Sequence, residues 1–256
     1  MIFQSKSKKS LGQNYLTDHN IINKIIKIGE IEKNKLVLEI GPGYGSLTKK
    51  ILSQNPKELI AIEKDKYLSS HLKETFKNNK NLIIINEDFL KFLKNKKLNK
   101  NYVVFGNLPY NISTQILASL VLLDKWPPWY SNLILMFQKE VAERILAKSK
   151  GKNFGRLAIL CNWRLEIKKH FDVSKNCFSP KPKINSTVLS FKPKKNKFYL
   201  KNPKNLEYIT RILFSGRRKM INKNFAKLFQ NNISVAKDLD INLKLRPEEL
   251  NIETYY

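Results

Sequence analysis

Four consecutive residues, Asn107-Leu108-Pro109-Tyr110, suit a planar base that carries an exocyclic amino group. The Asn107 amide oxygen and the Leu108 backbone carbonyl can each accept a hydrogen bond from that amino group. The Tyr110 ring can stack on the base, which contributes roughly 1–3 kcal/mol per base, and Pro109 stiffens the loop. These contacts would direct the lone pair of the amine out of the ring plane, toward an electrophile. The alternative interpretation is a strand-to-helix turn with a capping Asn and a terminating Pro.

A glycine-rich turn, Gly41-Pro42-Gly43-Tyr44-Gly45, follows an apolar run. Glycines at alternate positions let the backbone turn tightly and approach a ligand, with a helix N-terminus beyond. The pattern is Gly-x-Gly-x-Gly and differs from the Gly-x-Gly-x-x-Gly of dinucleotide-binding proteins, because position 46 is Ser. A glycine turn with no ligand is the alternative.

Two acidic residues follow the next two apolar runs. Glu63 can accept hydrogen bonds from both ribose hydroxyls, and Asp88 can accept one from an adenine amino group, with Phe89 against the ring. A solvated carboxylate and a helix cap are the respective alternatives. Two acids and a glycine turn without a P-loop lysine predict a pocket for an adenosine that lacks a diphosphate. S-adenosylmethionine fits that pocket better than NAD or ATP.

Alternating strands and helices must hold these loops in place. The predicted strands are 36–40, 58–62, 82–85, 102–105 and 133–137, with a late pair at 164–171 and 187–191, and the predicted helices include 21–28, 46–52, 140–147 and 155–162. This alternation predicts a doubly wound α/β sheet. In such sheets ligands bind at the carboxyl ends of the strands, where Asn107 is expected.

The C-terminal quarter of the chain has a different pattern. Residues 193–204 are charged, contain proline and predict a linker. The predicted domains are therefore 1–192, which holds the cofactor and the chemistry, and a helical domain at 205–256. We expect four cations to share a helix with Lys227 and to contact nucleic-acid phosphates; the alternative is a solvated helix face. These four are Arg217, Arg218, Lys219 and Lys223.

Composition points to a polyanionic partner. The 256 residues carry 48 Lys and Arg against 21 Asp and Glu, a formal charge of +27. Codon drift in an AT-rich genome explains part of the lysine excess but not the scarcity of carboxylates. A phosphate backbone is the commonest partner of such a chain.

The remaining composition narrows the class of protein further. Two cysteines, Cys161 and Cys177, are too few for a disulfide framework and predict free thiols. The three histidines stand at no metal-ligand spacing, so no metal is expected. A chain without an apolar run of eighteen residues or an apolar signal core is expected to be cytoplasmic, without contact to a membrane.

Taken together and in order, the motifs resemble the KsgA-type 16S rRNA adenine dimethyltransferases from about residue 6 to Leu250. The motifs are Gly12-Gln13-Asn14-Tyr15-Leu16, Glu39-Ile40-Gly41-Pro42-Gly43, Glu63, Asp88, Asn107-Leu108-Pro109-Tyr110-Asn111-Ile112-Ser113, Phe178-x-Pro180-x-Pro182-Lys183 and Arg217-Arg218-Lys219. The resemblance implies a class I methyltransferase fold with a mostly parallel seven-stranded sheet and a small C-terminal helical domain. It also implies S-adenosylmethionine as methyl donor, used twice per adenosine, on two adjacent adenosines near the 3′ end of small-subunit rRNA.

The resemblance assigns roles residue by residue. The resemblance places cofactor contacts at Asn14, Leu16, Gly41, Glu63, Asp88 and Asn107. Two further contacts are expected from position: Gly43, because it lies in the glycine turn, and Phe89, because it directly follows Asp88. Asn107, Leu108, Pro109 and Tyr110 match the base-holding motif, and Phe178 matches an aromatic on the other face of the base. Gln115, Lys181 and Asn185 depart from the family pattern, which affects only the fine positioning of substrate.

The expected partner is small-subunit rRNA in a 30S assembly intermediate, bound by a monomer. Three other functions remain as alternatives: a 23S rRNA adenine methyltransferase, a nucleic-acid-binding factor that has lost catalysis, and a nicotinamide-dependent oxidoreductase. The intact Asn107 motif, Gly41 and Glu63 disfavour the second, and Ser46 with the Asn107 motif disfavours the third.

Overall fold

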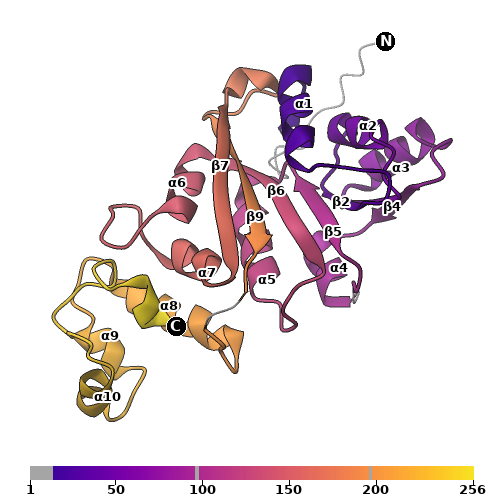
Figure 1. Ribbon diagram of the computed structural model, residues 1–256. Helices are drawn as coiled ribbons and strands as arrows, with labels where there is room; N and C mark the ends of the chain where they lie inside the picture. The colour runs from indigo at the N-terminus through magenta and orange to yellow at the C-terminus, as the bar shows by residue number, and fades with distance from the viewer. Residues whose placement is uncertain (1–13, 96–97, 196–197) are drawn as a thin grey trace. The chain divides into compact units, whose positions relative to one another are not determined.

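The computed structural model describes residues 14–95, 98–195 and 198–256 (Figure 1). Gly12, Gln13 and the basic residues before them lie outside this range. The chain divides into two compact units. The first comprises Met1–Leu117, Pro127–Lys139 and Glu166–Pro193, and the second comprises Ala118–Trp126, Glu140–Leu165 and Lys194–Tyr256.

A seven-stranded sheet forms the centre of the first unit (Figure 1). Its strands are β2 (Leu36–Ile40), β3 (Glu58–Glu63), β4 (Leu82–Asn86), β5 (Tyr102–Gly106), β6 (Tyr130–Gln138), β7 (Leu165–Val173) and β9 (Ser186–Pro193). They lie in the order β4-β3-β2-β5-β6-β9-β7. The pairs from β4 to β6 are parallel, and β9 is antiparallel to β6. The predicted mostly parallel sheet is therefore confirmed.

The chain order reverses at β2, because β3 lies on one side of it and β5 on the other. Ile40, the last residue of β2, stands opposite Ile62 on β3 and Gly106 on β5. The loops after these strands consequently leave the sheet at one edge. This switch point is where ligands bind in open α/β sheets.

Helices cover the sheet and bury its apolar residues. Those that follow or precede the parallel strands are α1 (His19–Ile28), α2 (Ser46–Leu52), α3 (Lys66–Thr75), α4 (Phe89–Asn95) and α5 (Tyr110–Val121). Asp18 caps α1 by accepting from the backbone N–H groups of Asn20 and Ile21. Ile22, Ile25 and Ile26 of α1 then pack in one core cluster with Val103 and Phe105, alternate residues of β5. The sequence predicts α1 and α2, whereas α3, α4 and α5 were not predicted.

A second, two-stranded sheet pairs distant parts of the first unit. Strands β1 (Tyr15–Leu16) and β8 (Phe178–Ser179) are antiparallel, with Leu16 opposite Phe178. The Thr17 backbone N–H donates to the Cys177 carbonyl at 2.9 Å, and a short 3-10 turn, η2 (Lys175–Cys177), precedes β8. The segment that holds Asn14 is thereby fixed to the loop that holds Phe178.

The second unit is helical. Its elements include α6 (Lys139–Leu146), α7 (Arg156–Arg164), α8 (Pro203–Leu213), α9 (Asn222–Ala226) and α10 (Asn232–Asp238), with the 3-10 turns η3 (Phe214–Gly216) and η4 (Ile252–Tyr255). Arg164 is buried with its guanidinium carbon 3.8 Å from the Trp163 ring centroid and 4.7 Å from that of Trp126. Its Nη1 donates to the carbonyls of Val121 and Leu123.

The two compact units do not follow the predicted boundaries at 192 and 205. Strand β9 ends at Pro193 and α8 begins at Pro203, so the predicted linker does lie between two elements. However, 118–126 and 140–165 group with the C-terminal segment. A C-terminal domain that starts at residue 205 stays a prediction.

Among residues 14–95, 98–195 and 198–256, no helix is long and apolar enough to cross a lipid bilayer.

Candidate active site

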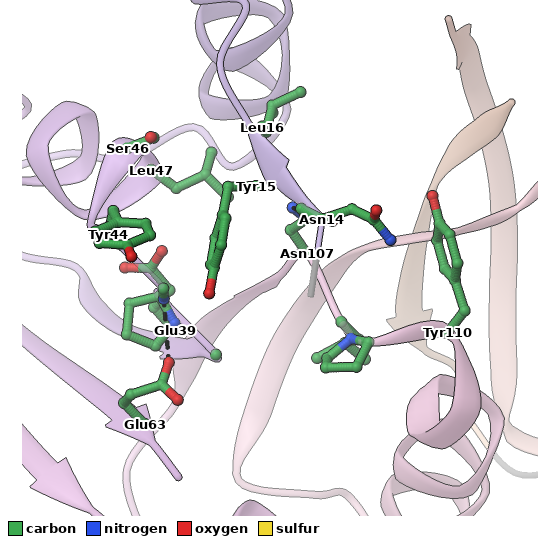
Figure 2. Close-up of a pocket in the computed structure, with 15 residues that line it drawn as sticks. Asn14, Tyr15, Leu16, Glu39, Tyr44, Ser46, Leu47, Glu63, Asn107 and Tyr110 are labelled. Atoms are coloured by element: carbon green, nitrogen blue, oxygen red, sulfur yellow. Dashed lines mark hydrogen bonds between the residues drawn. The ribbon is translucent and has the colours of Figure 1, made fainter. Parts of the chain in front are cut away.

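Four segments of the chain surround one pocket at the switch point (Figure 2). Its walls come from the segment 14–16, the turn after β2, the end of β3 and the loop after β5. The residues that line it are Asn14, Tyr15, Leu16, Glu39, Gly41, Pro42, Gly43, Tyr44, Ser46, Leu47, Glu63, Asn107, Leu108, Pro109 and Tyr110. The structure thus brings the Asn107 motif to the mouth of the glycine turn, as the sequence predicts.

The Asn107 amide is oriented by the chain's own backbone. Its Nδ2 donates to the Asn14 carbonyl at 3.1 Å. Because the nitrogen end of the amide is engaged there, the carbonyl oxygen Oδ1 is the end that can accept from a substrate. Leu108, whose side chain is buried, and Pro109 complete the loop before α5 begins at Tyr110.

Tyr110 lies half-buried with its hydroxyl 2.7 Å from the Ser186 hydroxyl. Burial raises the pKa of the Tyr110 phenol, while the hydrogen bond with Ser186 opposes that rise. The ring is therefore a neutral aromatic surface, as stacking on a base requires.

The glycine turn has the backbone that its sequence predicts. Gly41, Gly43 and Gly45 have φ values of +66°, +61° and +85°, in the left-handed region that favours glycine. The Gly43 N–H donates to Glu63 Oε2 at 3.1 Å, and the Asp65 N–H donates to Oε1 at 2.8 Å. Burial raises the pKa of Glu63, and these backbone donors oppose that rise. Glu63 accordingly ties the end of β3 to the turn.

Glu39 is a second buried carboxyl group in this pocket. Its Oε2 accepts from the Thr48 hydroxyl at 2.6 Å. Burial raises its pKa from an ordinary 4.5 to about 7; the Thr48 bond opposes the rise and the charge of Glu63 adds to it. Glu39 is the first residue of the motif Glu39-Ile40-Gly41-Pro42-Gly43, but no role was predicted for it.

A second pocket shares Gly41, Glu63, Leu108 and Pro109 with the first. Apolar side chains supply most of its remaining wall: Ile40, Ile62, Phe89, Leu90, Ile112 and Ile116. Such a slot suits a flat heterocycle. Its polar lining includes Lys64, Glu87 and Asp88.

Asp88 performs the capping task that was the alternative for it. Its Oδ1 accepts from the Leu90 N–H at 2.9 Å, and its Oδ2 pairs with Lys64 at 2.9 Å. Partial burial would raise its pKa, but the hydrogen bonds from Lys64 and Leu90 hold the pKa below its ordinary value. Asp88 and Phe89 both line the second pocket, so the structure brings the predicted cofactor residues together.

Tyr15 and Tyr44 line the first pocket, although the sequence assigns neither a role. Their ring centroids lie 4.7 Å apart, edge to face (Figure 2). A Cβ added at Gly43 would lie 2.8 Å from the Tyr15 ring, so this ring covers the turn closely. The one sequence feature that could have indicated a role for Tyr15 is its position between Asn14 and Leu16, two predicted cofactor contacts.

The structure does not bring Phe178 to either pocket. Its side chain is 5% exposed and belongs to the core cluster that contains Leu16 and Ile22. The residues that line the pockets in the described part of the chain do not include it. Its predicted stacking on the base stays a prediction.

The predicted basic cluster lies in the second unit, but not on one helix. Arg217 stands in a turn after η3, and α9 begins only at Asn222, so the expectation of a single helix from Arg217 to Lys227 is wrong. The Arg217 guanidinium holds that turn, because it pairs with Glu248 at 2.7 Å and donates to the Lys152 carbonyl. Arg218, Lys219 and Lys223 are exposed.

Comparison with known proteins identifies the family. A family model described as "Ribosomal RNA adenine dimethylase" matches residues 4–256. "Ribosomal RNA small subunit methyltransferase A" of Pelagibacter ubique (strain HTCC1062) is 50% identical over 251 residues, 98% of this chain and 95% of that protein. The protein of the same name from Wolbachia sp. subsp. Drosophila simulans (strain wRi) is 38% identical and covers 99% of this chain and 92% of its own length.

Similarity to solved structures supports the same assignment. The crystal structure of a dimethyladenosine transferase from Plasmodium falciparum superimposes with a TM-score of 0.77 at 29% identity, over 94% of both chains. That of the 23S rRNA methyltransferase ErmE has a TM-score of 0.69 at 19% identity, over 94% of this chain and 96% of that one, and shows the same fold. By these matches over nearly its whole length, the chain belongs to the ribosomal RNA adenine dimethylase family.

Proposed function

We propose that the Asn107-Leu108-Pro109-Tyr110 loop presents the exocyclic amine of a target adenine to the methyl donor. The chain is an S-adenosylmethionine-dependent rRNA adenine dimethyltransferase by family. The observation that carries the proposal is the hydrogen bond from Asn107 Nδ2 to the Asn14 carbonyl, because it leaves Oδ1 to accept from the amine. The Leu108 carbonyl accepts the second amine proton, and Tyr110 stacks on the base.

The two adjoining pockets fit S-adenosylmethionine. The apolar slot beside Asp88 and Phe89 holds its adenine, and Glu63 at the end of β3 accepts from the ribose hydroxyls. Asn14, Leu16, Gly41 and Gly43 surround the remainder of the cofactor, next to Asn107. Lys64 is the basic residue among the described lining residues and already pairs with Asp88, which disfavours a diphosphate ligand.

Catalysis in this site is mainly alignment. S-adenosylmethionine supplies a methyl group on a positively charged sulfur, which needs no further activation. An amide oxygen and a backbone carbonyl are not general bases, so Asn107 and Leu108 act by fixing the direction of the amine lone pair. Such orientation can contribute on the order of 7–11 kcal/mol to lowering a barrier. Bonds that favour the pyramidal amine are stronger in the transition state than in the ground state, and therefore raise kcat.

We extend the proposal to the substrate and its setting. The targets are two adjacent adenosines near the 3′ end of 16S rRNA, within a 30S assembly intermediate, and the enzyme acts as a monomer. The names of the relatives and the charge of +27 support a small-subunit rRNA substrate. Arg218, Lys219 and Lys223 contact its phosphates. A cytoplasmic location follows from this substrate.

A methylation assay with separated ribosomal subunits tests the proposal. Small and large subunits from cells that lack the enzyme are incubated with it and labelled S-adenosylmethionine, and the modified nucleosides are mapped by mass spectrometry. We expect label in small subunits only, as dimethyladenosine at two adjacent positions. Label in large subunits would indicate a 23S rRNA enzyme, and no label in either would indicate a factor without catalytic activity.

A further inference from the structure

Ser186 touches the proposed base platform from a distant part of the chain. Its hydroxyl and that of Tyr110 are 2.7 Å apart, although 76 positions separate the two residues. Ser186 is fully buried, at 0% exposure. It is the first residue of β9 and stands opposite Gln138, the last residue of β6. No motif in the sequence links it to the Asn107 loop.

The backbone on both sides of this contact is held firmly. The Lys139 N–H donates to the Asn185 carbonyl at 3.0 Å, one residue before Ser186. On the other side, Tyr110 opens α5, and the Ser113 N–H donates to the Pro109 carbonyl at 3.1 Å. The Tyr110 side chain is consequently held at its Cα by the first turn of a helix and at its hydroxyl by the first residue of β9.

We propose that Ser186 is a positioning residue for methyl transfer, which holds the Tyr110 ring in its place through the hydrogen bond between the two hydroxyls. A phenol ring attached only at its Cβ can rotate about two side-chain bonds. A hydrogen bond at the hydroxyl restricts rotation about the Cα–Cβ bond, which swings the whole ring, whereas rotation about the Cβ–Cγ bond leaves the hydroxyl oxygen where it is. The ring is therefore already in place when the adenine arrives. This inference rests on the proposed stacking role of Tyr110.

The proposal makes Ser186 act only through Tyr110, and a double-mutant cycle measures that dependence. Ser186→Ala and Tyr110→Phe each remove one of the two hydroxyls and keep the rest of the side chain. The kcat/KM for undermethylated small subunits is measured for wild type, both single variants and the double variant. The dissociation constant for S-adenosylmethionine is measured alongside by calorimetry.

We expect each single variant to lose roughly five- to tenfold in kcat/KM, the effect of about one hydrogen bond, with cofactor affinity unchanged. The double variant should be no worse than the poorer single variant, because the two changes remove the same contact. Losses that multiply in the double variant would overturn the proposal, as would wild-type activity of either single variant.

Two controls separate positioning from folding. Ser190→Ala removes another buried hydroxyl of β9, which bonds to His170 at 2.8 Å, and should leave activity at the wild-type level. If Ser186→Ala does not fold, as judged by its melting curve, Ser186→Thr takes its place. Ser186→Thr retains a hydroxyl and should retain activity, whereas Tyr110→Phe must still show a loss in kcat/KM of roughly five- to tenfold. Tyr110→Ala tests the premise: full activity there would refute base stacking and, with it, the positioning role of Ser186.

Discussion

Glu39 is a carboxyl group held inside the protein with one side-chain donor, Thr48. An unfolded chain ionises it near its ordinary pKa of 4.5, whereas burial raises the pKa in the folded protein to about 7. Between these two values the folded state holds more protons than the unfolded state. The stability contribution of Glu39 is therefore largest below its unfolded pKa and falls as pH rises toward 7.

Replacing this carboxyl group with an amide should remove that dependence. Glu39→Gln keeps an oxygen for the Thr48 hydroxyl but does not ionise. We expect the variant to lose less unfolding free energy than wild type between about pH 5 and about pH 8, measured by urea titration without cofactor. Parallel pH profiles for the two proteins would show that Glu39 is not held in its protonated form.

Phe178 is the residue whose predicted role and observed position differ most. Its side chain lies in the core with Leu16 across the β1–β8 pair. We expect Phe178→Ala to lower the unfolding free energy by about 3–5 kcal/mol, as large-to-small core substitutions do, and Phe178→Leu to lower it much less. If Phe178→Ala keeps its stability but loses turnover, the stacking role implied by the family resemblance is correct.

At the scale of elements, the stability of the turn after β2 depends on its backbone conformation and on the Tyr15 ring that packs over it. Gly41 and Gly43 have nearly equal φ values, +66° and +61°, but only the second meets a neighbour. A Cβ at Gly43 would come within 2.8 Å of the Tyr15 ring, whereas nothing lies within 4 Å of one at Gly41. These two positions therefore separate backbone strain from steric contact.

We expect Gly41→Ala to cost roughly 1–2 kcal/mol of stability, the strain of a left-handed alanine, and Gly43→Ala to cost more. In a Tyr15→Leu background, the extra cost at Gly43 should shrink because the smaller side chain can give way. Thermal unfolding with and without S-adenosylmethionine measures both effects. Equal costs for the two alanine variants would mean that Tyr15 does not cover the turn.

The elements that carry the chemistry could be predicted from the sequence because their signals are local. Gly41 and Asn107 directly follow the apolar runs that form β2 and β5, and parallel pairing brings the ends of these strands together. The strand ends, and with them most of the pocket wall, followed from this pattern.

The contacts that sequence reasoning missed join distant segments. Strands β1 and β8 are two residues each, too short for a periodic signal. The bonds from Asn107 to Asn14 and from Tyr110 to Ser186 span 93 and 76 positions. The predicted helix from Arg217 to Lys227 does not form, because Arg217 lies in a turn where it bonds to Glu248 and Lys152. Local spacing does not show this pairing.

On the scale of the whole molecule, the charge of +27 should act through phosphate contacts. The triple variant Arg218→Ala, Lys219→Ala and Lys223→Ala removes three exposed cations of the second unit. We expect the slope of log K against log salt for small-subunit rRNA to become shallower by roughly 2, at about 0.7 per contact. Filter binding at several salt concentrations measures this slope.

Lys57→Ala is the matched control for that experiment. Lys57 is exposed and directly precedes β3, so it lies at the edge of the sheet away from the pocket. Its removal should leave the slope at the wild-type value. If Lys57→Ala changes the slope as much per charge as the triple variant does, binding reflects diffuse charge and not a defined phosphate contact.

The most direct test of the account is the Asn107→Ala variant, because Asn107 is assigned the task of aligning the amine. We compare single-turnover methylation of undermethylated small subunits with the dissociation constant for S-adenosylmethionine. We expect the rate to fall by several hundredfold or more, about the loss that follows removal of one aligned hydrogen-bonding group at a transition state, with a far smaller change in cofactor affinity. Equal losses in rate and affinity would contradict it, because Asn107 would then serve to bind the cofactor and not to direct the amine.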